Sequence, residues 1–451
     1  MHLSIEDCGH YSRVRLPKKA NLLACHAHDS KRYPYYLESQ KYLNEQSRYD
    51  ILFAFPEQKI VAEKLTSNNF ITQFNQQFSK SSGTHLSKAE LPFTGGWFVF
   101  FSYEYIAHIE FTLSSLDVDD SLPIAIATRI PAAIINDHGN KSSWLICEKG
   151  KEALLEKLYI DITSCSQITV NKPSINLNED DPNRFLKGVQ KINTYLKDGD
   201  TLQVNLSRQW SGVLSKETDY LDIYRALQIS NPSPFAGLAV FDDTIICSSS
   251  PERLIKTLGN TVEMRPIAGT RPRDINKERD VRLKNELLSN TKENAEHIML
   301  LDLIRNDLGR FCQTGSIKVD EKMTVESYST VHHLVSKVSG LFDPSKINPM
   351  DIINAVFPGG TITGCPKIRC MEIINELENQ PRGAYTGSMG YINNTGDMDL
   401  NILIRSIVVK DEFLNFRTGA GIVADSIANN ELIETQHKAK GLLKALNIKY
   451  A

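Results

Sequence analysis

The stretch Phe357-Pro-Gly-Gly-Thr-Ile-Thr-Gly-Cys-Pro-Lys367 places three glycines and two threonine hydroxyls directly before a predicted helix. Pro366 suits the first position of a helix, where its missing N–H is not needed, and apolar residues recur at helical spacing over 367–378. The free N–H groups at the start of a helix favour an anion. The stretch is therefore predicted either to bind a negatively charged small molecule or to be a glycine-rich connection without a ligand.

The chain around this stretch mixes long helices with many strands. Hydrophobic periodicity predicts helices at 184–197, 218–229, 282–309, 366–378 and 428–447, and strands at 202–210, 235–240, 244–249, 262–268, 334–340, 384–393, 400–410, 413–418 and 420–423. Several of these strands follow one another across short turns. That order favours antiparallel pairing, and hence an α+β fold rather than a doubly wound parallel sheet.

Two regions of the chain differ in composition and in their predicted helices and strands. Residues 1–170 combine strand-like apolar runs with polar connections, residues 171–183 are polar and contain two prolines, and the long helices begin after them. We therefore expect an N-terminal region over 1–170, a linker over 171–183 and a catalytic region over 184–447. Both regions are expected to merge into one globular body.

Composition sets further limits. The chain has 451 residues, of which 41% are hydrophobic and 23% charged, with a net charge of -3. No strong basic field recruits nucleic acid, no apolar run approaches the length of about 20 residues that spans a membrane, and the N-terminus lacks the pattern of a signal peptide. The eight cysteines include no CxxC pair, which is typical of a cytoplasmic protein with free thiols.

Two predicted helices carry carboxylates at one spacing. Glu293 and Glu296 are three residues apart, and Glu431 and Glu434 repeat the arrangement, with Lys438 one turn further along. Such pairs are usually solvated surface. If the two helices faced each other, however, the carboxylates would repel unless a cation lay between them, and hard oxygen ligands suit Mg²⁺.

Other polar residues stand at the ends of predicted strands. Glu252 follows the serines at 248–250, Thr270 follows the strand predicted over 262–268, and Arg405 ends an apolar run, where an anion partner would be useful. His333 stands in an otherwise apolar strand, where a histidine is either a hydrogen-bonded core residue or a catalyst.

Taken together and in order, these segments resemble the chorismate-utilising enzymes. The resemblance covers about residues 185–447 strongly and 34–105 more weakly. It rests on Gln203-Val-Asn-Leu, Ser250-Pro-Glu-Arg, Pro266-Ile-Ala-Gly-Thr, Ala295-Glu-His, Asp302-Leu-Ile-Arg-Asn-Asp, the glycine-rich stretch, Gly387–Tyr391 and Gly419-Ala-Gly. The resemblance implies a large α/β sandwich built on two antiparallel sheets, and a dianionic substrate, chorismate, bound with Mg²⁺.

The resemblance also implies roles for individual residues. Glu296 and Glu434 correspond to direct Mg²⁺ ligands, and Glu293 and Glu431 to nearby or water-mediated supports. Glu252 corresponds to the acid that assists departure of the C4 hydroxyl, with His333 close to the reacting ring. The implied catalytic set is completed by Gln203 and Thr270, and the implied substrate-binding set is Ala268, Gly269, Thr361, Tyr391, Arg405, Gly419, Gly421 and Lys438.

The nucleophile separates members of this family. Isochorismate and salicylate synthases use a lysine base to activate water, and this chain has Gln203 at the matching position, which cannot serve as a base. Ammonia is therefore the expected nucleophile, which leaves aminodeoxychorismate synthase component I and anthranilate synthase component I. Ala268 is similar to the anthranilate enzymes, whereas many aminodeoxychorismate synthases have a lysine there that attacks C2. The other motifs favour 4-amino-4-deoxychorismate, towards 4-aminobenzoate and folate, and leave open what replaces that lysine.

The resemblance has consequences for partners. We find no class I amidotransferase signature, so ammonia is expected from a separate glutamine amidotransferase subunit in a heterodimer. Tyr35-Tyr-Leu-Glu38-Ser39 resembles a tryptophan-binding tract of anthranilate synthases, which suggests bound tryptophan near Glu38 and Ser39; a plain strand end is the alternative. A catalytically silent chorismate-binding subunit is a further alternative, against which Glu252, His333 and the helix carboxylates argue.

Overall fold

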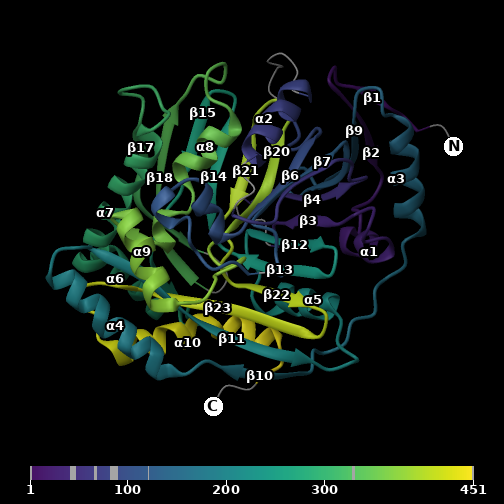
Figure 1. Ribbon diagram of the computed structural model, residues 1–451. Coiled ribbons are helices and arrows are strands. Elements are labelled where there is room, and N and C mark those ends of the chain that lie inside the picture. The colour runs from purple at the N-terminus through teal and green to yellow at the C-terminus, as the bar shows by residue number, and fades with distance from the viewer. Residues whose placement is uncertain are drawn as a thin grey trace.

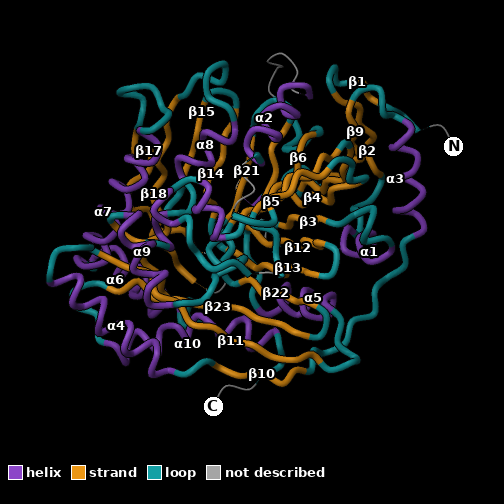
Figure 2. The backbone as a smooth tube through the Cα atoms, viewed as in Figure 1, coloured by secondary structure: helices purple, strands orange, loops and turns teal. Residues whose placement is uncertain are grey.

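The computed structural model describes residues 3–40, 47–65, 69–81, 90–119, 121–327 and 331–448. Two large antiparallel sheets form its centre, and helices lie around their outer faces (Figures 1 and 2). The prediction of a two-sheet antiparallel α/β sandwich is confirmed. No helix in the described ranges is both long enough and apolar enough to cross a membrane.

The first sheet combines strands from both ends of the chain. Its order is β1 (Glu6–Asp7), β2 (Tyr11–Leu16), β9 (Ser142–Glu148), β8 (Ala132–Asp137), β4 (Tyr49–Ala54), β3 (Tyr35–Glu38), β12 (Phe235–Phe241), β13 (Thr244–Ser250), β22 (Ser406–Lys410), β23 (Phe413–Ile422), β11 (Gln203–Leu214) and β10 (Ile175–Glu179), with β19 (Gly364–Cys365) beside β11. The junction is the pairing of β3 with β12. The N-terminal and C-terminal regions therefore share one hydrogen-bonded sheet.

The second sheet is also shared. Its order is β16 (Ile267–Pro272), β18 (Val331–Leu341), β15 (Thr261–Met264), β14 (Arg253–Leu258), β21 (Met398–Asn401), β20 (Ser388–Asn393), β6 (Gly96–Phe101), β7 (Ala125–Ile130) and β5 (Lys59–Ala62), with β17 (Lys318–Ser327) beside β18. Apolar side chains of the two sheets meet in a common core: the ring of Tyr35 on β3 stacks on that of Phe98 on β6 at a centroid distance of 3.9 Å. Such stacking adds to the stabilisation from burial.

The helices surround the sheets (Figure 2). They are α1 (Leu22–His28), α2 (Phe70–Ser81), α3 (Ala153–Ser164), α4 (Pro182–Lys197), α5 (Tyr220–Ser230), α6 (Lys277–Ser289), α7 (Thr291–Gly309), α8 (Pro349–Val356), α9 (Lys367–Glu378) and α10 (Ala428–Ala445), with short 3₁₀ helices η2 (Tyr103–His108), η3 (Phe111–Leu113) and η4 (Gly360–Ile362). The helix predicted over 282–309 is two helices. The side chain of Asn290 accepts a hydrogen bond from Glu293 N at 3.1 Å, and this cap starts α7.

Several predicted strands have different bounds. The strand predicted over 400–410 is divided between β21 and β22, which belong to different sheets. Arg405 lies at the division, with a φ of 52° that breaks the extended backbone. The polar segment predicted as a linker contains β10, which pairs with β11 at the edge of the first sheet. Polarity alone did not reveal this strand, because an edge strand can expose its side chains.

Candidate functional site

Glu252 and Arg405 lie in two connections that cross between the sheets. Glu252 follows β13 of the first sheet and directly precedes β14 of the second, and Arg405 lies where the chain returns from β21 to β22. The connections are joined by backbone hydrogen bonds: Ile402 N donates to Glu252 O at 3.0 Å, and Ser249 N donates to Arg405 O at 3.1 Å. The paired crossovers therefore place an acid beside a cation.

Glu252 is a buried acid with hydrogen-bonding and cationic neighbours. The residue is 7% exposed, and the hydroxyl of Thr361 in the glycine-rich loop donates to its Oε1 at 2.9 Å. Burial raises the pKa of Glu252 to about 7, although the Thr361 hydrogen bond and the charges of Arg405 and Lys438 act in the opposite direction. A carboxyl with this pKa can donate a proton near neutral pH.

His333 and Thr270 face each other across β18 and β16. The Oγ1 of Thr270 and the Nδ1 of His333 are 2.8 Å apart. Burial lowers the pKa of His333 to about 4, and the nearby Arg405 acts in the same direction, so the imidazole is neutral at pH 7. Ala268 lies two residues before Thr270 on β16 and is partly buried.

The carboxylates of α7 lie near β16. Glu293 accepts a hydrogen bond from Arg271 Nη1 at 2.7 Å, and its Oε2 is buried without a hydrogen-bond partner among the described residues. A Cβ on Gly269 would lie 2.5 Å from this Oε2, so the glycine permits the approach. Glu296 lies one turn further along α7 and is partly buried.

The carboxylates of α10 are more open. Glu434 forms an ion pair with Lys438 at 2.8 Å, both side chains are about half exposed, and Glu431 is partly buried. Lys438 also donates to the carbonyl of Gly419 at 2.9 Å. Within the ranges that the structure describes, no three His, Cys, Asp or Glu side chains gather closely enough to hold a metal ion. The four helix carboxylates therefore form no closed cage of their own.

The donor chemistry nevertheless fits Mg²⁺. All four side chains offer hard oxygen atoms, and Mg²⁺ is commonly held by one or two carboxylates, with water and substrate oxygens completing the octahedron. The buried, unpartnered Oε2 of Glu293 is an acceptor that a cation or its water would satisfy.

Two glycines on β23 make room for amides on β11. A Cβ on Gly421 would lie 2.4 Å from Gln203 Nε2, and one on Gly419 would lie 2.8 Å from Asn205 Oδ1 and 2.7 Å from the hydroxyl of Tyr385. In the described part of the chain, Gln203 Oε1 and Asn205 Oδ1 are buried without hydrogen-bond partners. Buried acceptors of this kind indicate a place where a ligand or water supplies the donor.

Tyr391, which is expected in the substrate-binding set, has largely aromatic neighbours. On β20 its ring lies among Phe53 and Phe93, at centroid distances of 6.2 and 5.7 Å, and it lines a different cavity. Tyr385, six residues earlier, is the tyrosine whose hydroxyl approaches Gly419. Sequence reasoning did not name Tyr385 or Asn205, although Asn205 belongs to a motif that it used.

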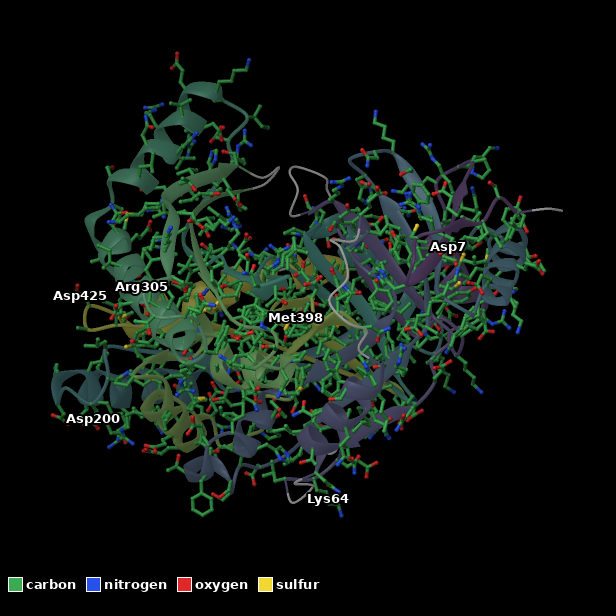
Figure 3. All side chains as sticks on the ribbon, turned by 90° about the horizontal axis from the view of Figure 1, so that it is seen from above. Asp7, Lys64, Asp200, Arg305, Met398 and Asp425 are labelled. Atoms are coloured by element: carbon green, nitrogen blue, oxygen red, sulfur yellow. The ribbon has the colours of Figure 1, made fainter. Side chains whose placement is uncertain are left out.

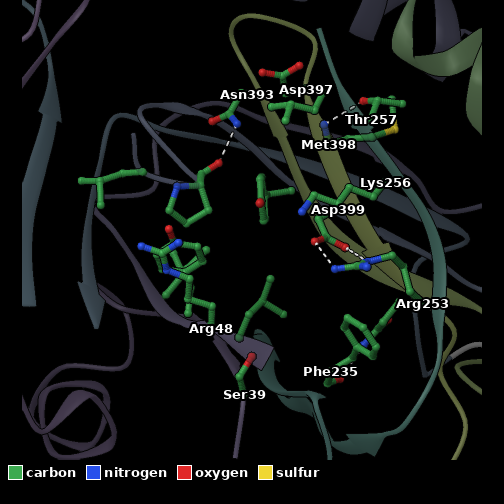
Figure 4. A pocket seen from close by; sticks show the side chains of 18 of the residues that line it. Ser39, Arg48, Phe235, Arg253, Lys256, Thr257, Asn393, Asp397, Met398 and Asp399 are labelled. Atoms are coloured by element: carbon green, nitrogen blue, oxygen red, sulfur yellow. Dashed lines mark hydrogen bonds and ion pairs between the residues drawn. The ribbon is translucent and has the colours of Figure 1, made fainter. Parts of the chain in front are cut away.

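The cavity that Tyr391 lines is separate from the site around Glu252 and is called the second cavity below. It lies between strands of the two sheets and has a volume of about 520 Å³. Ser39 follows β3 and Arg48 precedes β4 of the first sheet, and both face Met398 and Asp399 on β21 of the second sheet (Figure 4). In the view from above, Met398 lies near the middle of the molecule (Figure 3). Glu38 also lines it and accepts hydrogen bonds from Tyr224 and Gln228. The tract Tyr35–Ser39 is thus both a strand end and one wall of a cavity.

Comparison with known proteins places these sites in context. A family model described as chorismate binding enzyme matches residues 32–444. An anthranilate synthase component I-like protein from Synechocystis sp. is 43% identical over 361 residues, which cover 79% of this chain and 73% of that protein. Aminodeoxychorismate synthase component 1 from Bacillus subtilis is 41% identical over 372 residues, covering 79% and 78%. The crystal structure of anthranilate synthase component I from Streptococcus pneumoniae superposes with a TM-score of 0.76 at 32% identity, covering 88% of this chain and 92% of that one.

Proposed function

The chain belongs to the family of chorismate binding enzymes, and on that premise we propose that it aminates chorismate with ammonia to 4-amino-4-deoxychorismate. The reaction exchanges the C4 hydroxyl for an amino group and releases water. The observation that supports ammonia as the nucleophile is that an amide, Gln203, packs against Gly421 at the position where the resemblance implies a lysine base in water-using enzymes. An amide cannot take a proton from water at neutral pH, whereas ammonia is nucleophilic without a base.

Glu252 acts as the general acid in this proposal. Its Oε1 accepts a hydrogen bond from the Thr361 hydroxyl, so the transferable proton is held on Oε2. Protonation of the C4 hydroxyl by Glu252 lets the C–O bond break with the loss of water, and a positioned acid typically accelerates such a step by about 10²–10⁴-fold. Arg405 and Lys438 supply the positive charge that a dianion needs, with Thr361 and Gly421 as further parts of the binding set.

Mg²⁺ is the proposed cofactor. Glu296 and Glu434 would hold the ion, and Glu293 and Glu431 would support it through water or through their position. When bound, the ion neutralises charge on the substrate.

Ammonia is proposed to come from a glutamine amidotransferase subunit in a heteromeric complex. This rests on the family relationship and on the lack of an amidotransferase motif in the sequence. If the purified chain alone hydrolysed glutamine, a separate glutaminase would be unnecessary and the proposal of a partner would fail.

Anthranilate synthesis is the second candidate. In that reaction the amino group is added at C2, and pyruvate and water leave. Ala268 favours it, because the lysine that many aminodeoxychorismate synthases carry there is missing. Relatives named for both products match this chain.

Product identification tests the proposal. The purified chain is incubated with chorismate, Mg²⁺ and ammonium salt at mildly alkaline pH, and the products are separated by chromatography with mass detection. A 4-amino-4-deoxychorismate peak that a suitable lyase converts to 4-aminobenzoate is the expected result. Anthranilate with pyruvate would overturn the proposed product and favour the alternative, and unchanged chorismate would overturn both.

We also propose that the second cavity binds tryptophan beside Glu38 and Ser39. The cavity of about 520 Å³ can enclose an amino acid of this size. Carboxylate and aromatic groups, Glu38 and Tyr391 among them, line it.

A further inference from the structure

We propose that Arg382 is a positioning residue, because it joins the three elements that form one side of the chorismate site. The inference rests on the function proposed above and adds a residue to it. Arg382 lies in the connection between α9 and β20, is 4% exposed, and has no polar atom free for a substrate.

The guanidinium of Arg382 contacts each of the three elements directly. Nη2 donates to the carbonyl of Asn205 on β11 at 2.7 Å, and Nη1 donates to the carbonyl of Ile362 in the glycine-rich loop at 3.2 Å. The guanidinium also lies over the ring of Tyr385, 5.5 Å from its centroid. The side chain of Asn205 and the hydroxyl of Tyr385 both approach Gly419, and Ile362 follows Thr361, which bonds the acid Glu252.

Every N–H group of the Arg382 guanidinium is hydrogen-bonded within the protein. Nε and Nη2 form a fork with the two oxygens of Glu378 at 3.0 and 2.6 Å, and Nη1 also donates to Thr386 Oγ1 at 3.3 Å. Together with the bonds to Asn205 and Ile362, all five N–H groups of the guanidinium have acceptors. Lysine has three donors and no planar fork, so it cannot reproduce this set.

Arg417 provides a matched control. It donates to the same carboxylate, from Nη2 to Glu378 Oε2 at 2.9 Å, and it is 5% exposed. Its other contacts are Ser207 Oγ at 3.0 Å and Gln209 Oε1 at 3.2 Å. The hydrogen bonds of Arg417 thus involve neither the glycine-rich loop nor Tyr385. Replacing either arginine disturbs the ion pairing of the buried Glu378 carboxylate. Only Arg382 connects that carboxylate to the elements proposed to lie beside the substrate.

The test compares Arg382→Lys with Arg417→Lys in the full chain. Melting temperature reports the structural cost, and steady-state kinetics with ammonium and Mg²⁺ report KM for chorismate and kcat separately. We expect both variants to melt at lower temperature than the wild type, and only Arg382→Lys to raise KM at least about tenfold, because displacing a binding wall weakens substrate binding. The kcat of both variants is expected to stay within about threefold of wild type.

A milder variant covers the case in which Arg382→Lys does not fold. Thr386→Ala removes one acceptor of Arg382 and leaves every charge in place; we expect it to raise KM about two- to fivefold with little change in melting temperature. Equal KM for Arg382→Lys, Arg417→Lys and wild type would overturn the positioning role, as would an unchanged KM for Thr386→Ala. Failure of the wild-type chain to consume chorismate is a different result and would overturn the proposed function itself.

Discussion

The hydroxyl of Thr361 donates a hydrogen bond of 2.9 Å to the buried carboxyl of Glu252, and so joins the glycine-rich loop to the crossover between the two sheets. The hydrogen bond favours the ionised carboxylate, whereas burial favours the neutral acid. Burial is the larger effect, and the pKa of Glu252 is raised to about 7. The loop that we expect to hold the substrate thus also contacts the group that we expect to protonate it.

Replacing Glu252 by Gln should abolish most turnover while preserving the fold. The amide keeps the shape and can still accept the Thr361 hydrogen bond, but it has no proton to give. We expect kcat to fall by about 10²–10⁴-fold, measured by chorismate consumption with ammonium and Mg²⁺. Activity within a few-fold of wild type would exclude Glu252 as the general acid.

The same variant makes a prediction about stability and pH. The folded-state pKa of Glu252, about 7, lies above the ordinary glutamate value of 4.5. Its stabilising contribution is therefore complete below about pH 4.5 and is lost as the pH rises through 7, in total roughly 3 kcal/mol. Glu252→Gln does not ionise, so its melting temperature should rise relative to wild type between about pH 5 and 8. A difference independent of pH would contradict the raised pKa.

Replacing Glu434 by Gln should remove Mg²⁺-dependent turnover without unfolding the chain. Its ion pair with Lys438 is about half exposed, so the loss of the pair should change the free energy of unfolding by less than about 1 kcal/mol. Titration with Mg²⁺, followed by calorimetry in the presence of chorismate, should show weakened binding.

Glu372→Gln is the control for that experiment. Glu372 is also a helix carboxylate, is 36% exposed in its side chain and pairs with Arg369 at 3.0 Å, but it belongs to α9. We expect normal Mg²⁺ binding and turnover for this variant. Full turnover by Glu434→Gln would remove Glu434 from the metal site.

The residue types of the site could be predicted from the sequence better than their arrangement. Glu252 and Arg405 stand out as charges at the ends of apolar strands, and Gly421 as part of a glycine motif. Their meeting depends on two crossovers between sheets, which are joined by backbone hydrogen bonds from residues far apart in the chain. Local periodicity carries no information on such long-range pairing.

The two tyrosines illustrate the same limit. Tyr385 and Tyr391 lie six residues apart in one stretch, and only the structure shows that Tyr391 belongs to the second cavity. Similarly, periodicity joined α6 and α7 into one helix, because the cap at Asn290 is a single polar side chain within a helical pattern. The fold class was predictable because it depends on many strands at once, whereas each site residue depends on one local geometry.

Replacing Gln203 by Lys should divert the reaction towards water. A lysine whose pKa is lowered by partial burial can accept a proton from water, which the amide cannot do. We expect an isomer of chorismate, with its hydroxyl at another ring carbon, to appear in the absence of ammonium. The isomer has the same mass as chorismate, so it is detected as a new chromatographic peak at that mass. Gln203→Met, which has no proton acceptor, serves as the control and should not give this product in quantity. If Gln203→Lys yields only the amine, Gln203 does not select the nucleophile.

Millimolar tryptophan should raise the melting temperature if it occupies the second cavity. A ligand at 100 times its dissociation constant stabilises the folded chain by about 2.7 kcal/mol. Glu38→Gln should diminish the shift, since the carboxylate that can meet the ammonium group is lost, and Glu372→Gln should not. No shift in wild type, or an equal shift in Glu38→Gln, would count against this site.

Replacing Gly421 by Ala should impair turnover more than stability. The new Cβ would lie 2.4 Å from Gln203 Nε2, which is the far end of a flexible side chain, and 3.4 Å from its Cδ. The amide can therefore swing away at little cost, but it then leaves the site. We expect a melting temperature within a few degrees of wild type and a fall in kcat/KM of at least about tenfold.

Two other glycines provide controls, one for a neutral substitution and one for a destabilising substitution. Gly309 ends α7 and has no atom within 4 Å of an added Cβ, so Gly309→Ala should change neither quantity. Gly364 has a φ of 138°, and its Cβ would lie 2.0 Å from the backbone oxygen of Gln203, so Gly364→Ala should lower the melting temperature strongly. If Gly421→Ala destabilises the chain as much as Gly364→Ala does, Gly421 is required for backbone packing rather than for the placement of Gln203. If it keeps full activity, the placement of Gln203 does not matter for the reaction.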